Sequence, residues 1–204
     1  MSDWGRFLEC VPWFVSPGAE VVVGPSSTWT RGALPGLPRL SALLASARVT
    51  PVSVAGHSYE LLCWGSSGWL CEPPSEADSS YPDSLRAFWR VFGGTVEQFF
   101  GPSTWWLNQN QVLTVDAASL SFCDVVSEYG FAGEEVRDYV TVAIEANGNL
   151  TAAHCTTGRL VLFAPDHSFS GVTSLGGYLY TFDEAPDLAS WIEACAGAWQ
   201  AGVS

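Results

Sequence analysis

The sequence predicts an α+β fold, in which an antiparallel sheet packs against amphipathic helices. Turn signals divide residues 139–163 into short apolar segments typical of a strand meander, and a further strand is expected near 178–182. Residues 83–92 and 186–201 carry apolar side chains at helical spacing. The chain has 204 residues, of which 48% are hydrophobic, so we expect one domain over residues 1–204.

The composition is strongly acidic, with a formal charge of -13, and all eight basic residues are arginine. Phosphate backbones would repel such a chain, which argues against nucleic-acid binding, and the apolar content argues against disorder. No secretory signal and no apolar run of about 18 residues is present, so we expect a cytoplasmic protein without membrane association. The six cysteines form no Cys-x-x-Cys pair, which predicts buried free thiols and neither metal nor cofactor.

Residues 1–50 are an N-terminal extension with few clear signals. Ser2 is placed to cap a short helix carrying Trp4 and Phe7. The segment 20–23 reads as a β-branched strand, and residues 37–47 repeat leucine at helical spacing.

Residues 50–74 read as strands, with a hairpin turn at 65–68. Asp83 is then expected to cap a helix that Gly93-Gly94 ends. Its apolar face consists of Leu85, Phe88, Trp89 and Phe92. Further on, residues 96–100 suggest a helical turn, and extended pieces at 105–107 and 112–115 flank a polar run.

The meander is the clearest signal. Asn147-Gly148 favours a type I′ turn and Thr157-Gly158 a second tight turn. If both loops have two residues, the following side chains share one face: Val142, Ile144, Thr151, Ala153, Cys155, Leu160 and Leu162. The other face would then carry Ala143, Glu145, Ala152, His154, Val161 and Phe163.

The final helix is expected to have Pro186 in its first turn. Its apolar stripe consists of Leu188, Trp191, Ile192, Cys195 and Trp199. Trp89, Trp191 and Trp199 all lie on predicted helix faces, so we expect them in the core.

Three segments resemble the SUKH superfamily of α+β proteins, which is abundant in bacterial toxin-immunity loci. They are residues 81–89 running into Gly93-Gly94, the strand-turn-strand series of 142–167, and the helix of 186–199. The resemblance covers about residues 80–200 and rests on hydrophobic pattern and turn chemistry. It implies a protein-interaction module, often an acidic one that neutralises a nuclease or similar toxin, and it implies no catalytic residues.

Charge points to the same class of function. Between Asp116 and Glu145, seven carboxylates occur with Arg137 as the sole basic residue. We expect these carboxylates to face a basic protein partner and to speed its association. The candidate binding residues are Asp124, Glu128, Glu134, Glu135 and Asp138.

An aromatic and amide cluster offers a second binding site. Trp105 and Trp106, with Asn108 and Asn110, could line a small-molecule pocket or anchor a protein interface. The alternative is a half-buried tryptophan pair that covers the sheet.

A cofactor-independent enzyme acting on a small apolar or aromatic substrate is the alternative function. Its acid-base residues would be Asp166, His167 and His154, provided that the strand ends bring them together. His154 and Cys155 should point to opposite faces of a strand, which argues against a dyad between them. In the simpler reading, Asp166 starts a turn and His167 is exposed.

Overall fold

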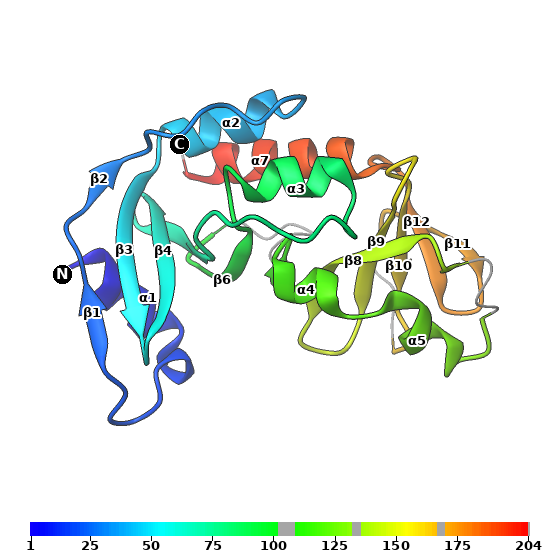
Figure 1. The fold of residues 1–204 in the computed structure, drawn as a ribbon, viewed down its shortest axis with the longest axis horizontal. Helices are drawn as coiled ribbons and strands as arrows, with labels where there is room; N and C mark the ends of the chain where they lie inside the picture. The colour runs from blue at the N-terminus through cyan, green and yellow to red at the C-terminus, as the bar shows by residue number, and fades with distance from the viewer. Residues whose placement is uncertain (102–108, 132–135, 167–169, 204) are drawn as a thin grey trace.

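The computed structural model describes residues 1–101, 109–131, 136–166 and 170–203, with the backbone alone for 109 and 110. It confirms the α+β class: the strands form one twelve-stranded antiparallel sheet in the order β1-β3-β4-β5-β6-β7-β8-β9-β10-β12-β11, and β2 also pairs with β3 (Figure 1). The strands of the first half are β1 (Val21–Val23), β2 (Ser27–Thr28), β3 (Arg48–Val54), β4 (His57–Trp64), β5 (Ser67–Cys71) and β6 (Thr95–Phe99). Those of the second half are β7 (Gln109–Val112), β8 (Tyr139–Glu145), β9 (Leu150–His154), β10 (Leu160–Phe163), β11 (Val172–Gly176) and β12 (Leu179–Phe182).

Helices cover both faces of the sheet (Figure 1). The described α-helices are α1 (Asp3–Cys10), α2 (Pro38–Ala45), α3 (Asp83–Trp89), α4 (Val115–Ser119), α5 (Phe122–Ser127) and α7 (Leu188–Val203), and a 3-10 turn, η1 (Pro12–Phe14), follows α1. Helices α2, α3 and α7 bury the main core on one face. On the other face, α1 packs under the first strands and α5 under the meander, each with its own smaller core.

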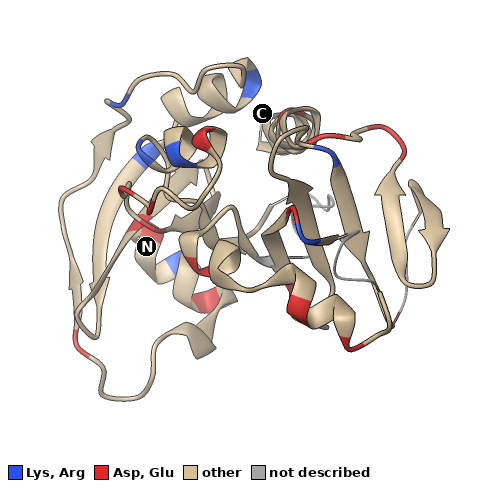
Figure 2. Cartoon of the chain, turned by 45° about the vertical axis from the view of Figure 1, so that its right-hand side comes forward, with Lys and Arg blue, Asp and Glu red and all other residues tan. Residues whose placement is uncertain are grey.

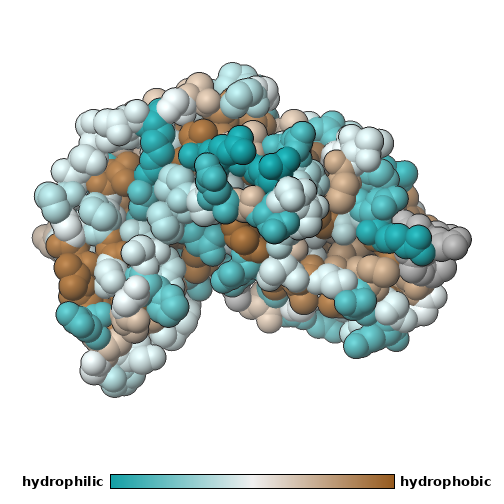
Figure 3. All heavy atoms as spheres, viewed as in Figure 1, coloured by the Kyte–Doolittle hydropathy of each residue, from teal (hydrophilic) through white to brown (hydrophobic). Residues whose placement is uncertain are grey.

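Because both faces are covered, successive residues of one strand enter different cores. Leu62 and Trp64 of β4 join the main core, whereas Leu61 and Cys63 join the α1 core. This double burial explains why the strands read as continuous apolar runs. The space-filling view also shows a deep notch between the α1 end and the α5 end, below the middle of the sheet (Figure 3).

The first half follows the sequence expectations closely. Gly5 N donates to Ser2 Oγ at 3.1 Å, so Ser2 caps α1 as predicted. In the β4-β5 hairpin, Trp64 pairs with Ser67 around a two-residue turn whose first residue, Gly65, has φ +59°. All four residues of the predicted apolar face at 83–92 are buried in the main core, although α3 ends at Trp89 and Phe92 follows it.

The predicted turn type and register of the meander are wrong. Gly148 N donates to Glu145 O, Glu145 N donates to Asn149 O, and φ is positive at Gly148 alone within the turn. The loop therefore has three residues, as in a type I turn followed by a left-handed glycine. A bulge between Thr141 and Ala143 shifts the register again.

These shifts move part of β8 to the other face. Ala143 joins the main core, whereas Ile144 packs in the α5 core, the reverse of the predicted faces. At the second turn, residues 155–158 form a loop between His154 and Arg159, so Cys155 lies outside the strand. Leu160 then pairs with Ala153 rather than with Cys155, as a two-residue loop would require. This register shift of two residues keeps the side chains of β9 and β10 on their predicted faces.

Two helix starts also differ from expectation. Pro82 is the extended residue before α3, so Asp83 lies inside the first turn, where it pairs with Arg86. Asp187 rather than Pro186 starts α7, because its Oδ1 accepts from Ser190 N at 2.9 Å. Helix α7 then runs through Gly202 to Val203, beyond the predicted end at 201.

The middle of the chain was predicted least well. Residues 95–99 form strand β6 rather than a helical turn, because they pair with β5. Strand β7 uses the polar run itself and ends at Val112, directly before Leu113, which has φ +58°. Of the segment expected to be extended at 112–115, Val112 lies in β7 and Thr114 is extended, but Val115 begins helix α4. Thr114 caps this helix, because Ala117 N donates to Thr114 Oγ1 at 3.0 Å.

The N-terminal segment is tied to the C-terminal helix. Arg39 N and Leu40 N, at the start of α2, donate to the two carboxylate oxygens of Glu193 on α7, at 2.9 and 3.1 Å. The buried leucines of α2 lie in the same core as the tryptophans of α7. Across the part of the chain that the structure describes, no helix is long and apolar enough to cross a bilayer.

Candidate functional site

The predicted acidic binding residues lie on the meander half of the molecule. Asp124 on α5, Glu128 just after it and Asp138 before β8 are all exposed. Asp124 and Glu128 are four residues apart in a helical segment, so they share one side of it. Glu134 and Glu135 lie outside the described residues.

Ion pairs between two described residues lie in the other half of the chain. Among the described residues, the four ion pairs join Asp3 to Arg6 and to Arg48, Arg31 to Glu60, and Arg86 to Asp83. Residues 91–204 hold 13 of the 21 acidic residues but two of the eight arginines, a formal charge of -11. The acidic residues of the meander half therefore keep most of their charge uncompensated (Figure 2).

Two exposed tyrosines lie beside the α5 acids. The rings of Tyr129 and Tyr178 meet edge to face at 5.7 Å, and they remain 49% and 43% exposed. Both rings also stack against Phe163 of β10, which holds them in place. We call the exposed residues Asp124, Glu128, Tyr129, Asp166 and Tyr178 the acidic tyrosine face. Asp166 follows by two residues Ala164, whose backbone N donates to Tyr178 O at 2.9 Å.

The candidate acid-base residues are not brought together. His154 ends β9 and is joined to Arg159 at the start of β10, whereas the exposed Asp166 lies beyond the opposite end of that strand. The four residues of β10 span about 13 Å, so no hydrogen bond can link the two side chains. His167 lies outside the described residues.

His154 has a structural role in its turn. Its Nδ1 accepts hydrogen bonds from Thr156 N and Thr157 N at 3.2 and 3.3 Å, and its ring packs edge to face on Tyr139 at 5.2 Å. Neighbouring Cys155 is exposed, but partial burial of its sulfur, and then the charge of Asp138, raise the pKa of the thiol. A protonated thiol is a poor nucleophile, so this pair is not suited to covalent catalysis.

The predicted aromatic and amide site cannot be placed. Trp105, Trp106 and Asn108 lie outside the described residues, as does the side chain of Asn110. The other predicted tryptophans are confirmed in the core, where Trp89, Trp191 and Trp199 are at most 1% exposed.

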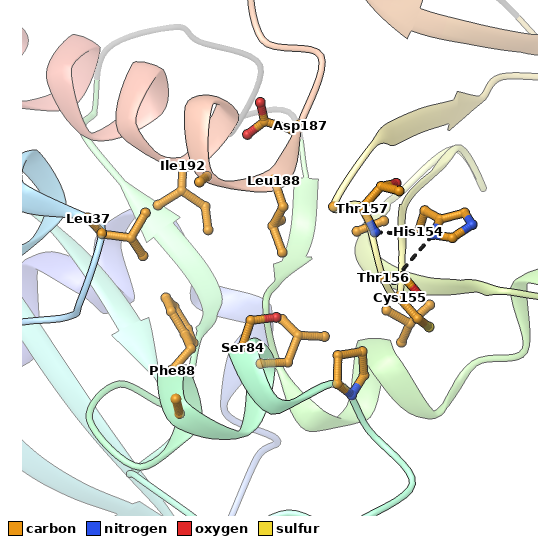
Figure 4. Close-up of a pocket in the computed structure, with 18 of the residues that line it drawn as sticks. Leu37, Ser84, Phe88, His154, Cys155, Thr156, Thr157, Asp187, Leu188 and Ile192 are labelled. Atoms are coloured by element: carbon orange, nitrogen blue, oxygen red, sulfur yellow. Dashed lines mark hydrogen bonds between the residues drawn. The ribbon is translucent and has the colours of Figure 1, made fainter.

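An apolar pocket of about 420 Å³ opens where four segments meet. One wall comes from the loop before α2, one from α3 and one from the start of α7. The fourth is the β9-β10 turn, residues 155–158, with His154 beside it (Figure 4). The ring of His154 points away from Leu188 and Phe88, so the histidine contributes little to the interior (Figure 4).

A half-buried carboxylate links the end of β5 to the start of helix α4. Glu72, directly after β5, accepts a hydrogen bond from Val115 N at the start of α4, at 3.2 Å. Burial raises the pKa of Glu72 to about 7, against the lowering effect of that hydrogen bond. Its charge therefore changes near neutral pH.

Metal-binding groups are not assembled in the described ranges: nowhere among them do three or more His, Cys, Asp or Glu side chains gather. All six cysteines are free thiols, but the expected burial holds for only three of them, Cys63, Cys71 and Cys195, and Cys155 is exposed. No family model, curated protein or solved structure matches this chain.

Sequence reasoning missed both the tyrosine pair and the pocket. Tyr129 and Tyr178 each adjoin a glycine that has positive φ, Gly130 and Gly177. This neighbourhood does not by itself signal exposure, because Trp64 adjoins the turn glycine Gly65 and is buried. The pocket had no local signal either, because its walls come from four separate parts of the chain.

Proposed function

We propose that this chain is an acidic, immunity-type interaction module that binds a basic protein, such as a toxin, through the acidic tyrosine face. One observation carries the proposal: every ion pair of the described residues lies between Asp3 and Arg86, while residues 91–204 have a charge of -11. Uncompensated charge of one sign attracts a partner of the other sign and raises its association rate. The SUKH resemblance of residues 80–200 supports the same class.

The two tyrosines provide apolar contact area that the charges of this face do not provide. Aromatic side chains are enriched at interface positions that contribute most to binding, and exposed ion pairs contribute little. Tyr129 and Tyr178 are held by Phe163, so their ordering costs little on binding. The face thus combines anchors with a rim of carboxylates from Asp124, Glu128 and Asp166.

Capture with charge-reversed baits tests the proposal. Native protein, tagged and expressed in its source cells, is cross-linked and its partner identified by mass spectrometry. We expect a basic partner whose affinity falls with rising salt and falls at least about tenfold in the double variant Asp124→Lys/Glu128→Lys. A second double variant, Tyr129→Ala/Tyr178→Ala, should weaken binding at all salt concentrations.

The matched control reverses two exposed acids of the other half, Glu9→Lys/Glu76→Lys, and should leave affinity nearly unchanged. Equal losses in both charge-reversed pairs, or binding insensitive to ionic strength, would contradict the proposed face. A toxin gene beside the coding gene would support this function, whereas a biosynthetic operon would favour an enzyme.

A further inference from the structure

The apolar pocket has the chemistry of a small-molecule site distinct from the acidic tyrosine face. Its volume of about 420 Å³ lies within the range of small-ligand pockets. Its floor consists of Leu37, Leu85, Phe88 and Ile192, which are 2–8% exposed. These side chains already belong to the main core, so a ligand would extend the packed interior rather than lie on a flat surface.

Charge narrows the class of ligand. Among the described residues that line the pocket there is no arginine, and Asp187 is the one carboxylate. The carboxylate of Asp187 accepts from Ser190 N at 2.9 Å, so it is engaged in starting α7. A carboxylate or phosphate on the ligand would find no counter-charge here, and the acidic protein would repel it.

Hydroxyl groups line the pocket from two sides, with Ser84 on α3 and two threonines on the β9-β10 turn (Figure 4). The β9-β10 turn brings Thr156 and Thr157 to the pocket, opposite Phe88 and Leu188 (Figure 4). Hydrogen bonds to His154 Nδ1 fix the turn, and Leu188 N donates to Gly158 O at 2.8 Å, which joins the turn to α7. The Thr156 hydroxyl forms no hydrogen bond with any described residue, so it is free to bond a ligand.

We propose that this pocket binds an uncharged, largely hydrocarbon small molecule whose single polar group faces Thr156. Its apolar part contacts the four floor residues, and its polar group accepts a hydrogen bond from the threonine hydroxyl. The site lies apart from the proposed partner face, so it does not depend on that function.

Fluorescence titration with two naphthalene dyes tests the proposal on the full chain. The uncharged ketone 6-propionyl-2-dimethylaminonaphthalene should bind at one site and shift its emission to the blue. The anionic dye 1-anilinonaphthalene-8-sulfonate should bind roughly tenfold more weakly or not at all. Equal binding of both dyes, or no binding of the uncharged one, would overturn the proposal.

Variants that fill the pocket with a larger side chain test whether the dye binds there. Ala87 on α3 and Ala189 on α7 both line the pocket and are exposed, so Ala87→Trp and Ala189→Trp add bulk without removing core atoms. Each should weaken binding of the uncharged dye roughly tenfold or more. Two variants on separate helices guard against the misfolding of one, which thermal melting monitors.

The matched control is Ala198→Trp, an exposed alanine of α7 that does not line the pocket. It should bind the uncharged dye as the native chain does; a similar loss there would overturn the site. Thr156→Val, which keeps the shape and removes the hydroxyl, should weaken binding about threefold to tenfold. Unchanged affinity in Thr156→Val would overturn the placement of the polar group.

Discussion

The backbone of Gly94 lies directly against the carbonyl group of Leu113. A Cβ atom at Gly94 would stand 2.3 Å from the Leu113 carbonyl oxygen, and that oxygen also accepts from Trp89 Nε1 at 2.6 Å. Leu113 N in turn donates to Val142 O at 2.7 Å. One peptide segment thus joins α3, β6 and β8 at the centre of the molecule.

Gly94→Ala should therefore be severely destabilising. The residue has φ +91°, which costs an alanine about 1–2 kcal/mol, and the new methyl group would also clash with backbone atoms. We expect the free energy of unfolding in urea to fall by at least about 3 kcal/mol.

Gly148→Ala is the matched control. Gly148 has φ +87°, but a Cβ there meets open space. The free energy of unfolding of this variant should therefore fall only by the conformational cost of positive φ, about 1–2 kcal/mol. Equal losses in the two variants would show that the contact with Leu113 relaxes at no cost.

Glu72→Gln should make the protein more stable at alkaline pH. Burial raises the pKa of Glu72 to about 7 in the folded state, from an ordinary 4.5, so folding favours the protonated form. Its contribution is complete below pH 4.5 and is lost as the pH rises through 7. Allowing for its partial exposure to solvent, we expect a gain of about 1–2 kcal/mol at pH 8.

Urea denaturation of both proteins between pH 4 and pH 8 measures this effect. The advantage of Glu72→Gln should shrink toward zero as the pH falls to 4. An advantage independent of pH would mean that the charge of Glu72 is not its source.

Glu193→Ala should detach the start of α2 from α7. Both carboxylate oxygens of Glu193 accept backbone hydrogen bonds, from Arg39 N and Leu40 N. Loss of a helix cap costs about 1–2 kcal/mol, and chemical denaturation should show a loss of that size. The control Glu184→Ala, at an exposed acid before α7, should change stability by less than about 0.5 kcal/mol.

Asp3→Asn should weaken the packing of α1 in a pH-dependent way. Arg48 donates to the carboxylate from Nε and Nη2, at 2.6 and 2.7 Å, and these bonds are the main cause that lowers the pKa of Asp3. Because the pKa is lowered in the folded state, Asp3 stabilises the protein at pH values above its ordinary pKa of 3.8. This stabilisation is lost as the pH falls through the folded-state pKa. Because Arg48 is half exposed, we expect a loss near 1 kcal/mol at pH 7.

Thermal melting at pH 7 and pH 2.5 measures this effect. The melting temperatures of the native protein and Asp3→Asn should differ less at pH 2.5 than at pH 7. Glu9→Gln, at an exposed residue of the same helix with no ion pair among the described residues, should match the native protein at both.

Local signals predicted the elements whose residues pack close to their neighbours in sequence. The Ser2 cap, the α3 face and the α7 stripe all follow from spacings of three or four residues. Strand β6 and helix α4 could not be predicted in this way, because the partner that makes residues 95–99 a strand is β5. Turn chemistry failed at Asn147, where a type I turn with Gly148 replaced the expected type I′ turn.

The candidate sites were predictable only in part. The exposure of Asp124, Glu128 and Asp138 agrees with their predicted role, but exposure of acidic residues is common and does not test that role. The proximity of Tyr129 to Tyr178 depends on a contact between α5 and the β11-β12 hairpin. Such long-range contacts leave no mark on local sequence.

The cap that Glu193 provides also sets an order of events during synthesis. The start of α2 lies 154 residues before its capping carboxylate. At ribosomal speeds of about 5–20 residues per second, α2 waits roughly 8–30 s for that partner. Until then its leucines have no α7 to pack against, so the emerging first half depends on remaining unaggregated until the last helix has left the ribosome.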